Sequence, residues 1–226
     1  MEKNPGKTNL NAIKVWDIPT RIFHWLLVGL LLISFVTVTL GPNTMPYHEG
    51  CGIGILGVLV FRLIWGIIGG YHSRFTSFVR GPREVGQYAS TFLTTKGSRY
   101  LGHNPLGGWS VLAMLGAALL QAVTGLFAND DIFTEGPLYP YVDKIVSDQL
   151  TTIHRLNSYL IMGLVAVHIL AILFYLVVKR ENLIRPMITG IKSWDGGGES
   201  SAEKPWAALA AAGTTALIIY VISCRL

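Results

Sequence analysis

The sequence is short of charge and of cysteine. Among its 226 residues only 18 are Lys or Arg and 13 are Asp or Glu, while 51% are apolar. A chain with so many apolar residues is not intrinsically disordered. Its mean hydropathy of +0.47, together with several unbroken apolar runs, is typical of a polytopic membrane protein.

Five apolar runs predict transmembrane helices, because a hydrocarbon core about 30 Å thick takes about 20 helical residues to cross. The fifth run is rich in alanine and less hydrophobic than the others. The first run is not a secretory signal, since it is longer than a signal h-region and since Gly41-Pro42-Asn43 offers no small-x-small cleavage site. The five predicted spans are residues 22–40, 50–68, 109–127, 156–178 and 206–223.

The formal net charge of +5 is distributed unevenly over the connections between these helices. The 41–47 connection has no Lys or Arg, and the 128–150 connection has only Lys144 among five acidic residues. By the positive-inside rule the N-terminus is therefore cytoplasmic, and five crossings put the C-terminus on the periplasmic side. The charge is explained by topology, so nothing supports nucleic acid as a partner. The three basic segments carry Lys3, Lys7, Lys14 and Arg21; Arg74, Arg80, Arg83, Lys96 and Arg99; and Lys179, Arg180, Arg185, Lys192 and Lys204.

Two connections and one linker have features of their own. Residues 82–95 predict a short helix that begins at a proline and lies at the cytoplasmic membrane surface. Apolar residues keep helical spacing over 142–153, so the fourth helix projects beyond the membrane or follows a short amphipathic helix. The Gly-rich segment 196–201 predicts a flexible linker to the fifth helix.

Four of the six histidines lie in or at the edges of the apolar helices: His24, His48, His154 and His168. An ionisable group at membrane depth is costly, so each is a candidate functional residue. His154 and His168 are fourteen residues apart, which returns to within about 40° of the same helix face about 21 Å further along the axis. The direction of each helix then pairs His24 with His168 on the cytoplasmic side and His48 with His154 on the outer side.

Two histidine pairs, each bridging two helices, are what bis-histidine ligation of haem iron requires. A transporter would concentrate its histidines at one position near the midplane. The pairs therefore predict two haems at two depths. The two cysteines, Cys51 and Cys224, form no CxxCH motif, so the haem would be b-type. Both cysteines are expected near the outer ends of their helices, where a disulfide is conceivable but a small buried thiol is common.

Two further residues are candidates for binding the cofactor. Arg62 lies fourteen residues after His48, on the same helix face and at the level of the inner haem. A buried Arg needs an anion, which a haem propionate would supply, although snorkelling to the interface is the alternative. His103 precedes Asn104-Pro105, which predicts a helix start whose free N–H groups could receive a propionate or a quinone oxygen.

Several motifs in order resemble the bacterial cytochrome b561 family, which includes the b-type cytochrome subunits of nickel-iron hydrogenases. They are VWDIPTRIFHW at 15–25, GHNPLGGW at 102–109, QAVTGLF at 121–127, and His154-Arg155 followed by His168. The resemblance covers about 15–192. It implies a four-helix core of the bacterial inner membrane in which His24, His48, His154 and His168 ligate two b haems, moving electrons between the quinone pool and a partner. The fifth helix departs from the shortest members, which have four.

The sequence thus predicts an all-α polytopic membrane protein with a di-haem four-helix bundle over 1–192, a flexible cytoplasmic linker over 193–205 and a fifth transmembrane helix over 206–226. The leading hypothesis is an electron carrier that acts between quinone or quinol and a redox partner such as a periplasmic c-type cytochrome, which would make it a quinone oxidoreductase. One alternative is a haem-bearing anchor subunit of a hydrogenase or formate dehydrogenase. Another is a transition-metal transporter that uses the same histidines. Homo-oligomerisation stays open.

Overall fold

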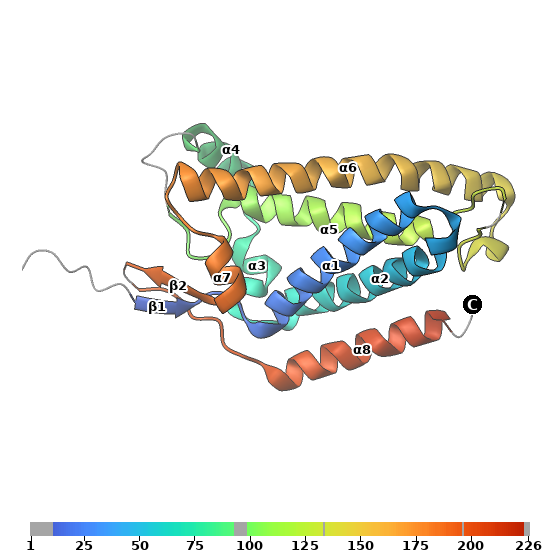
Figure 1. The fold of residues 1–226 in the computed structure, drawn as a ribbon. Coiled ribbons are helices and arrows are strands. Elements are labelled where there is room, and N and C mark those ends of the chain that lie inside the picture. The colour runs from blue at the N-terminus through green and yellow to red at the C-terminus, as the bar shows by residue number, and fades with distance from the viewer. Residues whose placement is uncertain (1–10, 93–98, 133, 196, 224–226) are drawn as a thin grey trace, which may run out of the picture.

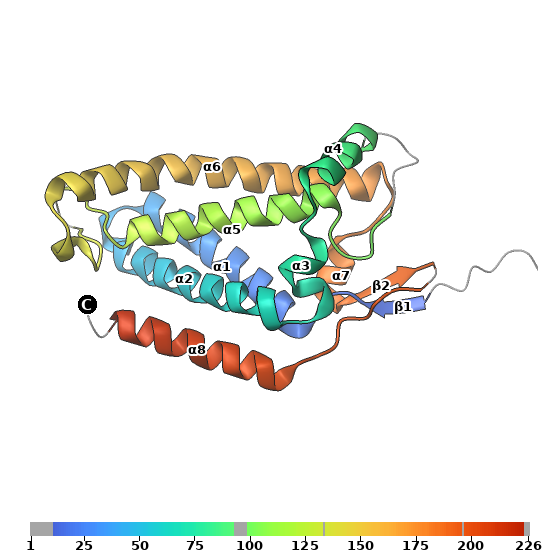
Figure 2. The same cartoon turned by 180° about the vertical axis from the view of Figure 1, so that it is seen from behind.

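A computed structural model describes residues 11–92, 99–132, 134–195 and 197–223 of the chain (Figure 1). Four helices are long and apolar enough to cross a membrane, which confirms the predicted helical membrane bundle. They are α1 (Ile18–Leu40), α2 (Met45–Ile68), α5 (Pro105–Gly125) and α6 (Lys144–Val177). A fifth apolar helix, α8 (Pro205–Ser223), runs beside α2 (Figure 2), and the Ile219 side chain lies at α2 near Gly57.

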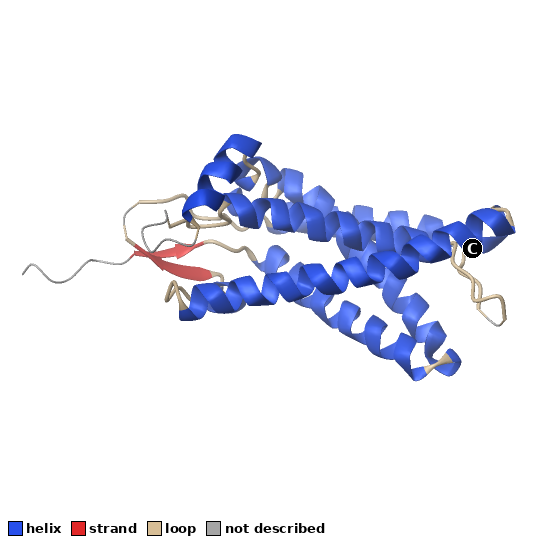
Figure 3. Ribbon diagram, turned by 90° about the horizontal axis from the view of Figure 1, so that it is seen from above, coloured by secondary structure: helices blue, strands red, loops and turns tan. Residues whose placement is uncertain are grey.

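The remaining elements are short and gather at the two ends of the bundle. The helices α3 (Phe75–Phe78), α4 (Pro82–Thr91) and α7 (Ile184–Thr189) lie at the same end as the strands β1 (Asn11–Lys14) and β2 (Ile191–Trp194). Figure 3 shows this two-stranded sheet at one end of the long helices, and we call that end the sheet end. The opposite end, called the turn end here, carries the 3-10 helices Pro42–Thr44 and Tyr139–Tyr141, whereas a third, Tyr71–Ser73, precedes α3.

The ends of the helices follow from local sequence. Asp17 caps α1 by accepting from the Thr20 N–H at 2.9 Å, and Asn104 caps α5 by accepting from the Gly107 N–H at 2.7 Å. A proline stands in the first turn of both helices, where its missing N–H costs nothing. Gly41 ends α1 with a φ of 98°, in a region of backbone conformation that favours glycine.

The core of the bundle lies between α1, α2 and α5 and is made of apolar side chains such as Leu59 and Leu115. Many large apolar side chains on the outer faces of α1 and α6 are exposed, as expected of surfaces that contact lipid. Helix α6 has 34 residues and so spans about 51 Å, well beyond the hydrocarbon thickness. Helix α6 is continuous from Lys144, which favours the prediction that the fourth helix extends beyond the membrane over that of a separate amphipathic helix. The short helix predicted over 82–95 is present as α4, although residues 93–98 lie outside the described residues.

Asp17 joins the start of α1 to the end of α2. Its fully buried carboxylate accepts hydrogen bonds from Trp65 Nε1 at 3.2 Å, the Gly70 N–H at 3.2 Å and Ser73 Oγ at 2.7 Å, in addition to the cap at Thr20. Ionised acceptors form the stronger hydrogen bonds, and each of these donors would be costly to leave without a partner. The carboxylate thereby fixes the first turn of α1, from which the chain leads on to His24.

The segment predicted as a flexible linker is anchored at several described positions. Its first residues, Ser193 and Trp194, lie in β2, which pairs with β1 in antiparallel register from Asn11↔Trp194 to Lys14↔Ile191. Ser201 is buried and donates to the Val15 carbonyl at 2.8 Å, and Glu203 pairs with Lys14 at 2.6 Å. The glycine-rich composition predicted flexibility, but these polar partners hold the segment against the start of α1.

Candidate functional site

The turn end brings together one of the two predicted histidine pairs. The ring centroids of His48 on α2 and His154 on α6 lie 6.3 Å apart, with an interplanar angle of 80°. Two imidazoles on one metal are separated by two metal–nitrogen bonds of about 2 Å plus about 1.1 Å from each nitrogen to its ring centre, about 6 Å in all. The separation therefore matches what two imidazole ligands of a single metal ion require.

Hydrogen bonds fix the tautomer of both rings. His48 Nδ1 donates to the Ser34 carbonyl at 2.9 Å, and His154 Nδ1 donates to the Gln121 carbonyl at 3.0 Å. A carbonyl oxygen only accepts, so each Nδ1 carries the proton and each Nε2 keeps its lone pair for a metal. Neither Nε2 has a hydrogen-bond partner among the described residues. Gly125 leaves space for the ring, since a Cβ there would lie 2.9 Å from His154 Cε1.

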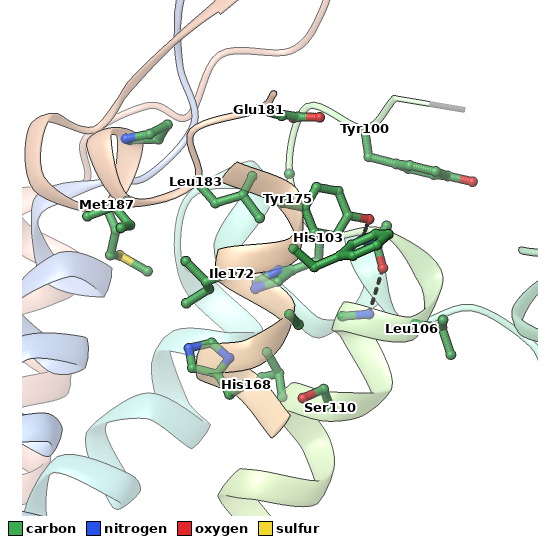
Figure 4. Close-up of a pocket in the computed structure, with 18 of the residues that line it drawn as sticks. Tyr100, His103, Leu106, Ser110, His168, Ile172, Tyr175, Glu181, Leu183 and Met187 are labelled. Atoms are coloured by element: carbon green, nitrogen blue, oxygen red, sulfur yellow. Dashed lines mark hydrogen bonds between the residues drawn. The ribbon is translucent and has the colours of Figure 1, made fainter. Parts of the chain in front are cut away.

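The sheet end brings the other two histidines to one cavity. His24 on α1 and His168 on α6 both line a space of about 800 Å³, which is within the range typical of cofactor sites, roughly 300–1,000 Å³. Figure 4 shows the cavity from His168 at its lower end to Tyr100 and Glu181 at its upper end.

His103 also lines this cavity, and its Nδ1 atom is buried. Its ring lies 4.7 Å from the Trp16 ring and 4.6 Å from the Phe78 ring, measured between centroids. Burial, assisted by the charge of Arg62, lowers the pKa of His103 to about 3. The imidazole is therefore neutral at pH 7 and presents a donor and an acceptor to the cavity.

Arg62 is buried, and its guanidinium lies 4.8 Å from the centroid of the Phe75 ring. Arg62 is not among the described residues that line the cavity, although its charge acts on His103. The buried nitrogens without a hydrogen-bond partner among the described residues include His24 Nδ1, Arg62 Nη1 and His103 Nδ1. Such orphaned groups call for an external partner. The cavity, its imidazoles and this cationic neighbourhood fit a haem with anionic propionates.

Sequence reasoning missed a polar cluster further along the same cavity. Tyr88 and Tyr175 share a hydrogen bond between their hydroxyls, and Asn104 donates to Tyr175. Glu181 and Lys192 form an ion pair that also lines the cavity. One signal could have found the cluster: Tyr175 follows His168 by seven residues, which places both within about 20° of one helix face.

The remaining candidate residues contribute less. Cys51 is a free, buried thiol, whereas Cys224 lies outside the described residues, so their pairing stays untested. Among the residues with described positions, no three His, Cys, Asp or Glu side chains gather in a group that could hold a metal ion. The chemistry of the site therefore rests on imidazole pairs, which suit an iron already held in a macrocycle.

Comparisons with known proteins agree with this chemistry. The family model described as prokaryotic cytochrome b561 matches residues 15–190. The chain is 27% identical over 216 residues to the "Probable Ni/Fe-hydrogenase B-type cytochrome subunit" of Rhizobium leguminosarum bv. viciae, covering 79% of this chain and 88% of that protein. It is 23% identical over 230 residues to the "Probable Ni/Fe-hydrogenase 1 B-type cytochrome subunit" of Escherichia coli K12, covering 87% and 97%. No solved structure matches the chain.

Proposed function

The chain belongs to the prokaryotic cytochrome b561 family, and from that premise we propose that it carries electrons across the membrane through two b haems. Family membership implies haem b, and the four apolar helices indicate a membrane protein. The number of haems and their ligands are the proposal: His48 with His154 at the turn end, and His24 with His168 at the sheet end. Haem iron supplies one-electron redox chemistry. The separation of 6.3 Å between the His48 and His154 rings carries the proposal.

The protein's own residues position the cofactors and balance their charge. The carbonyls of Ser34 and Gln121 hold the ligand rings at the turn end. At the sheet end we assign Arg62 and His103 to the propionates, because their buried nitrogens lack partners. A propionate close to a buried guanidinium would compensate a charge that is otherwise costly to bury.

The basic residues favour a cytoplasmic sheet end. Among the described residues, this end carries many Lys and Arg side chains, whereas the turn end has Lys144 paired with Asp131 at 2.7 Å and Asp148 at 2.9 Å. The positive-inside rule then puts the N-terminus in the cytoplasm, and α8 as a fifth crossing carries the C-terminus to the periplasmic side. The His24 and His168 pair would lie near the cytoplasm, and His48 and His154 near the periplasm.

We place quinone or quinol in the sheet-end cavity, in the part that continues beyond His168. The cavity continues from His168 to Tyr100 and Glu181, and its walls are largely apolar and aromatic with a few convergent polar groups. That combination is typical of sites for apolar ring compounds. Electrons would pass along α6, whose two histidines are about 21 Å apart along the axis, between this site and a redox partner at the turn end.

A second candidate function is the membrane subunit of an enzyme complex. The names of its relatives favour a nickel-iron hydrogenase as the complex, with catalysis on another chain. No observation favours a transition-metal transporter over these two electron-transfer functions. Purification from the native membrane tests them together: stoichiometric hydrogenase subunits would support the complex, and a chain isolated alone with quinol-reducible haem would support the free carrier. A purified chain without a reducible b-type spectrum would contradict both.

A further inference from the structure

Three polar side chains form a hydrogen-bonded chain in the sheet-end cavity. The hydroxyls of Tyr88 on α4 and Tyr175 on α6 lie 2.5 Å apart, and Asn104 Nδ2 donates to the Tyr175 hydroxyl at 2.6 Å. The orientation of the Asn104 amide is fixed, because its oxygen already accepts from the Gly107 N–H as the cap of α5. Tyr175 must therefore accept from Asn104, which leaves its own proton free to point toward Tyr88 or into the cavity.

The three hydrogen-bonded side chains lie between the level of His168 and the end of the cavity at Tyr100 and Glu181. Tyr175 is seven residues beyond His168, about 10.5 Å along α6 and on nearly the same face. The cavity is lined by His168 and by the three hydrogen-bonded side chains, Tyr88, Asn104 and Tyr175. Figure 4 shows Tyr175 above His168 and below Glu181. A quinone in the part of the cavity beyond the proposed haem site at His168 would thus meet the Tyr175 hydroxyl.

A mostly buried ion pair also lines the cavity, and its carboxylate, Glu181, lies above Tyr175 in Figure 4. Glu181 Oε1 lies 2.6 Å from Lys192 Nζ, and their side chains are only 13% and 8% exposed. Lys192 is held in place by the carbonyl of Tyr100, to which it donates at 2.6 Å. The Glu181 carboxylate interacts electrostatically with both phenols. It is the one acidic group that lines this cavity among the described residues, and its partial exposure lets it exchange protons with water.

The phenols can move protons without ionising. Burial raises the pKa of Tyr88, so this hydroxyl stays protonated at neutral pH. A protonated hydroxyl accepts one proton while it donates another, and two hydroxyls in contact can reverse their orientation together. Tyr88 and Tyr175 therefore suit a relay in which no charged phenolate is formed.

Building on the proposed quinone reaction, we propose that Tyr175 and Tyr88 relay protons between a quinone bound in this cavity and Glu181. Reduction of a quinone to a quinol takes two electrons, which haem iron would supply one at a time, and one proton on each of the two quinone oxygens. The relay serves the oxygen that faces Tyr175: this oxygen gains the Tyr175 proton, Tyr175 gains that of Tyr88, and Tyr88 gains that of Glu181, which is reprotonated from water. The second oxygen takes its proton directly from solvent, and oxidation runs the same steps in reverse.

Tyr88→Phe in the purified holoprotein tests the relay, because it removes the hydroxyl that is hydrogen-bonded to Tyr175 but keeps the bond from Asn104 to Tyr175. We expect proton uptake in a single turnover, followed with a pH-indicator dye, to slow together with the quinone reaction by about 100-fold, the low end of general acid–base effects. Glu181→Gln should also slow both proton uptake and the quinone reaction. The two-haem spectrum and the affinity for a non-reducible hydroxyquinoline N-oxide, measured by tryptophan quenching, should be unchanged in Tyr88→Phe.

Tyr159→Phe is the matched control, since Tyr159 is an exposed tyrosine on α6, the helix of Tyr175, and does not line the cavity. It should behave like the unchanged protein. Unchanged proton uptake in both Tyr88→Phe and Glu181→Gln would overturn the relay while leaving the proposed function intact. Loss of haem or of N-oxide binding in Tyr88→Phe would assign Tyr88 a structural role and also overturn it. If the unchanged protein does not react with quinone, the proposed quinone chemistry fails, and the relay fails with it.

Discussion

Substituting Gly125 by alanine tests the haem site proposed at the turn end. The added Cβ would lie 2.9 Å from His154 Cε1, whereas ordinary contacts begin at 3.4 Å. The imidazole must therefore retreat by about 0.5 Å, which is a large displacement for a ligand of a metal bond of about 2 Å. Changes to groups that orient metal-binding histidines cost about 10–100-fold in metal affinity. At about 1.4 kcal/mol for each factor of ten, the expected loss is about 1.4–2.8 kcal/mol.

The effect must be read from the turn-end haem and not from the overall stability of the protein. Alanine also stabilises the last turn of α5, by up to about 1 kcal/mol of helix propensity. Redox titration of the visible spectrum separates the two haems when their potentials differ. We expect Gly125→Ala to lose or shift one of the two components and to leave the other unchanged. Gly116→Ala on the same helix is the control, since a Cβ there meets nothing within 4 Å. Two unshifted components in Gly125→Ala would refute the assignment of His154 as a ligand.

Three further predictions rest on the same geometry. His168→Ala should remove the sheet-end haem and leave the turn-end haem, as counted by the pyridine haemochrome method. Loss of both haems, or of neither, would contradict the pairing. Asp17→Asn should lower the stability by about 2–4 kcal/mol, because the amide presents a donor to buried donors such as Trp65 Nε1; a thermal midpoint like that of the unchanged protein would contradict this role. Without haem, folding lowers the pKa of His103 from 6.5 to about 3, so protonation favours the unfolded state and the stability of the haem-free protein should fall as the pH drops from about 6.5 toward 3. In acid-unfolding curves, His103→Asn should make the stability fall less steeply with pH. An equally steep fall would show that His103 is not its cause.

The long helices could be predicted from sequence because the membrane requires long apolar runs with internally satisfied backbone groups. The first apolar run begins at residue 22, four residues after α1 begins at Ile18, because a hydropathy reading passes over the capping Asp17 and the polar Thr20 and Arg21. The strands β1 and β2 have four residues each and no alternating pattern strong enough to predict them. They form because the start of α1 and the end of α7 are brought side by side by tertiary packing.

The candidate site was predictable where it depends on depth along a helix. The direction of each span paired His48 with His154, and the structure places their rings together. Their hydrogen-bond partners were not predictable, because the carbonyls of Ser34 and Gln121 belong to the backbone and leave no mark in the sequence. The phenol pair was missed because Tyr88 comes from α4, whose position over the end of α6 is a tertiary property.

The glycine-rich segment shows the limit of composition as a guide. Glycine and serine favour flexibility in a chain without partners. Here Ser201 is buried against Val15, and the Glu199 carbonyl lies 2.8 Å from His72 Nε2. Polar partners far away in sequence decide the outcome, and no local pattern reports them.

The central claim is that one chain holds two b haems, each between two imidazoles. Its most direct test is electron paramagnetic resonance of the oxidised, purified protein, combined with haem and protein quantification on the same sample. The account predicts two haems per chain, both low-spin with bis-imidazole signals, and loss of one signal each in His154→Ala and His168→Ala. A single haem per chain, or a high-spin signal that accounts for one of the two, would contradict it.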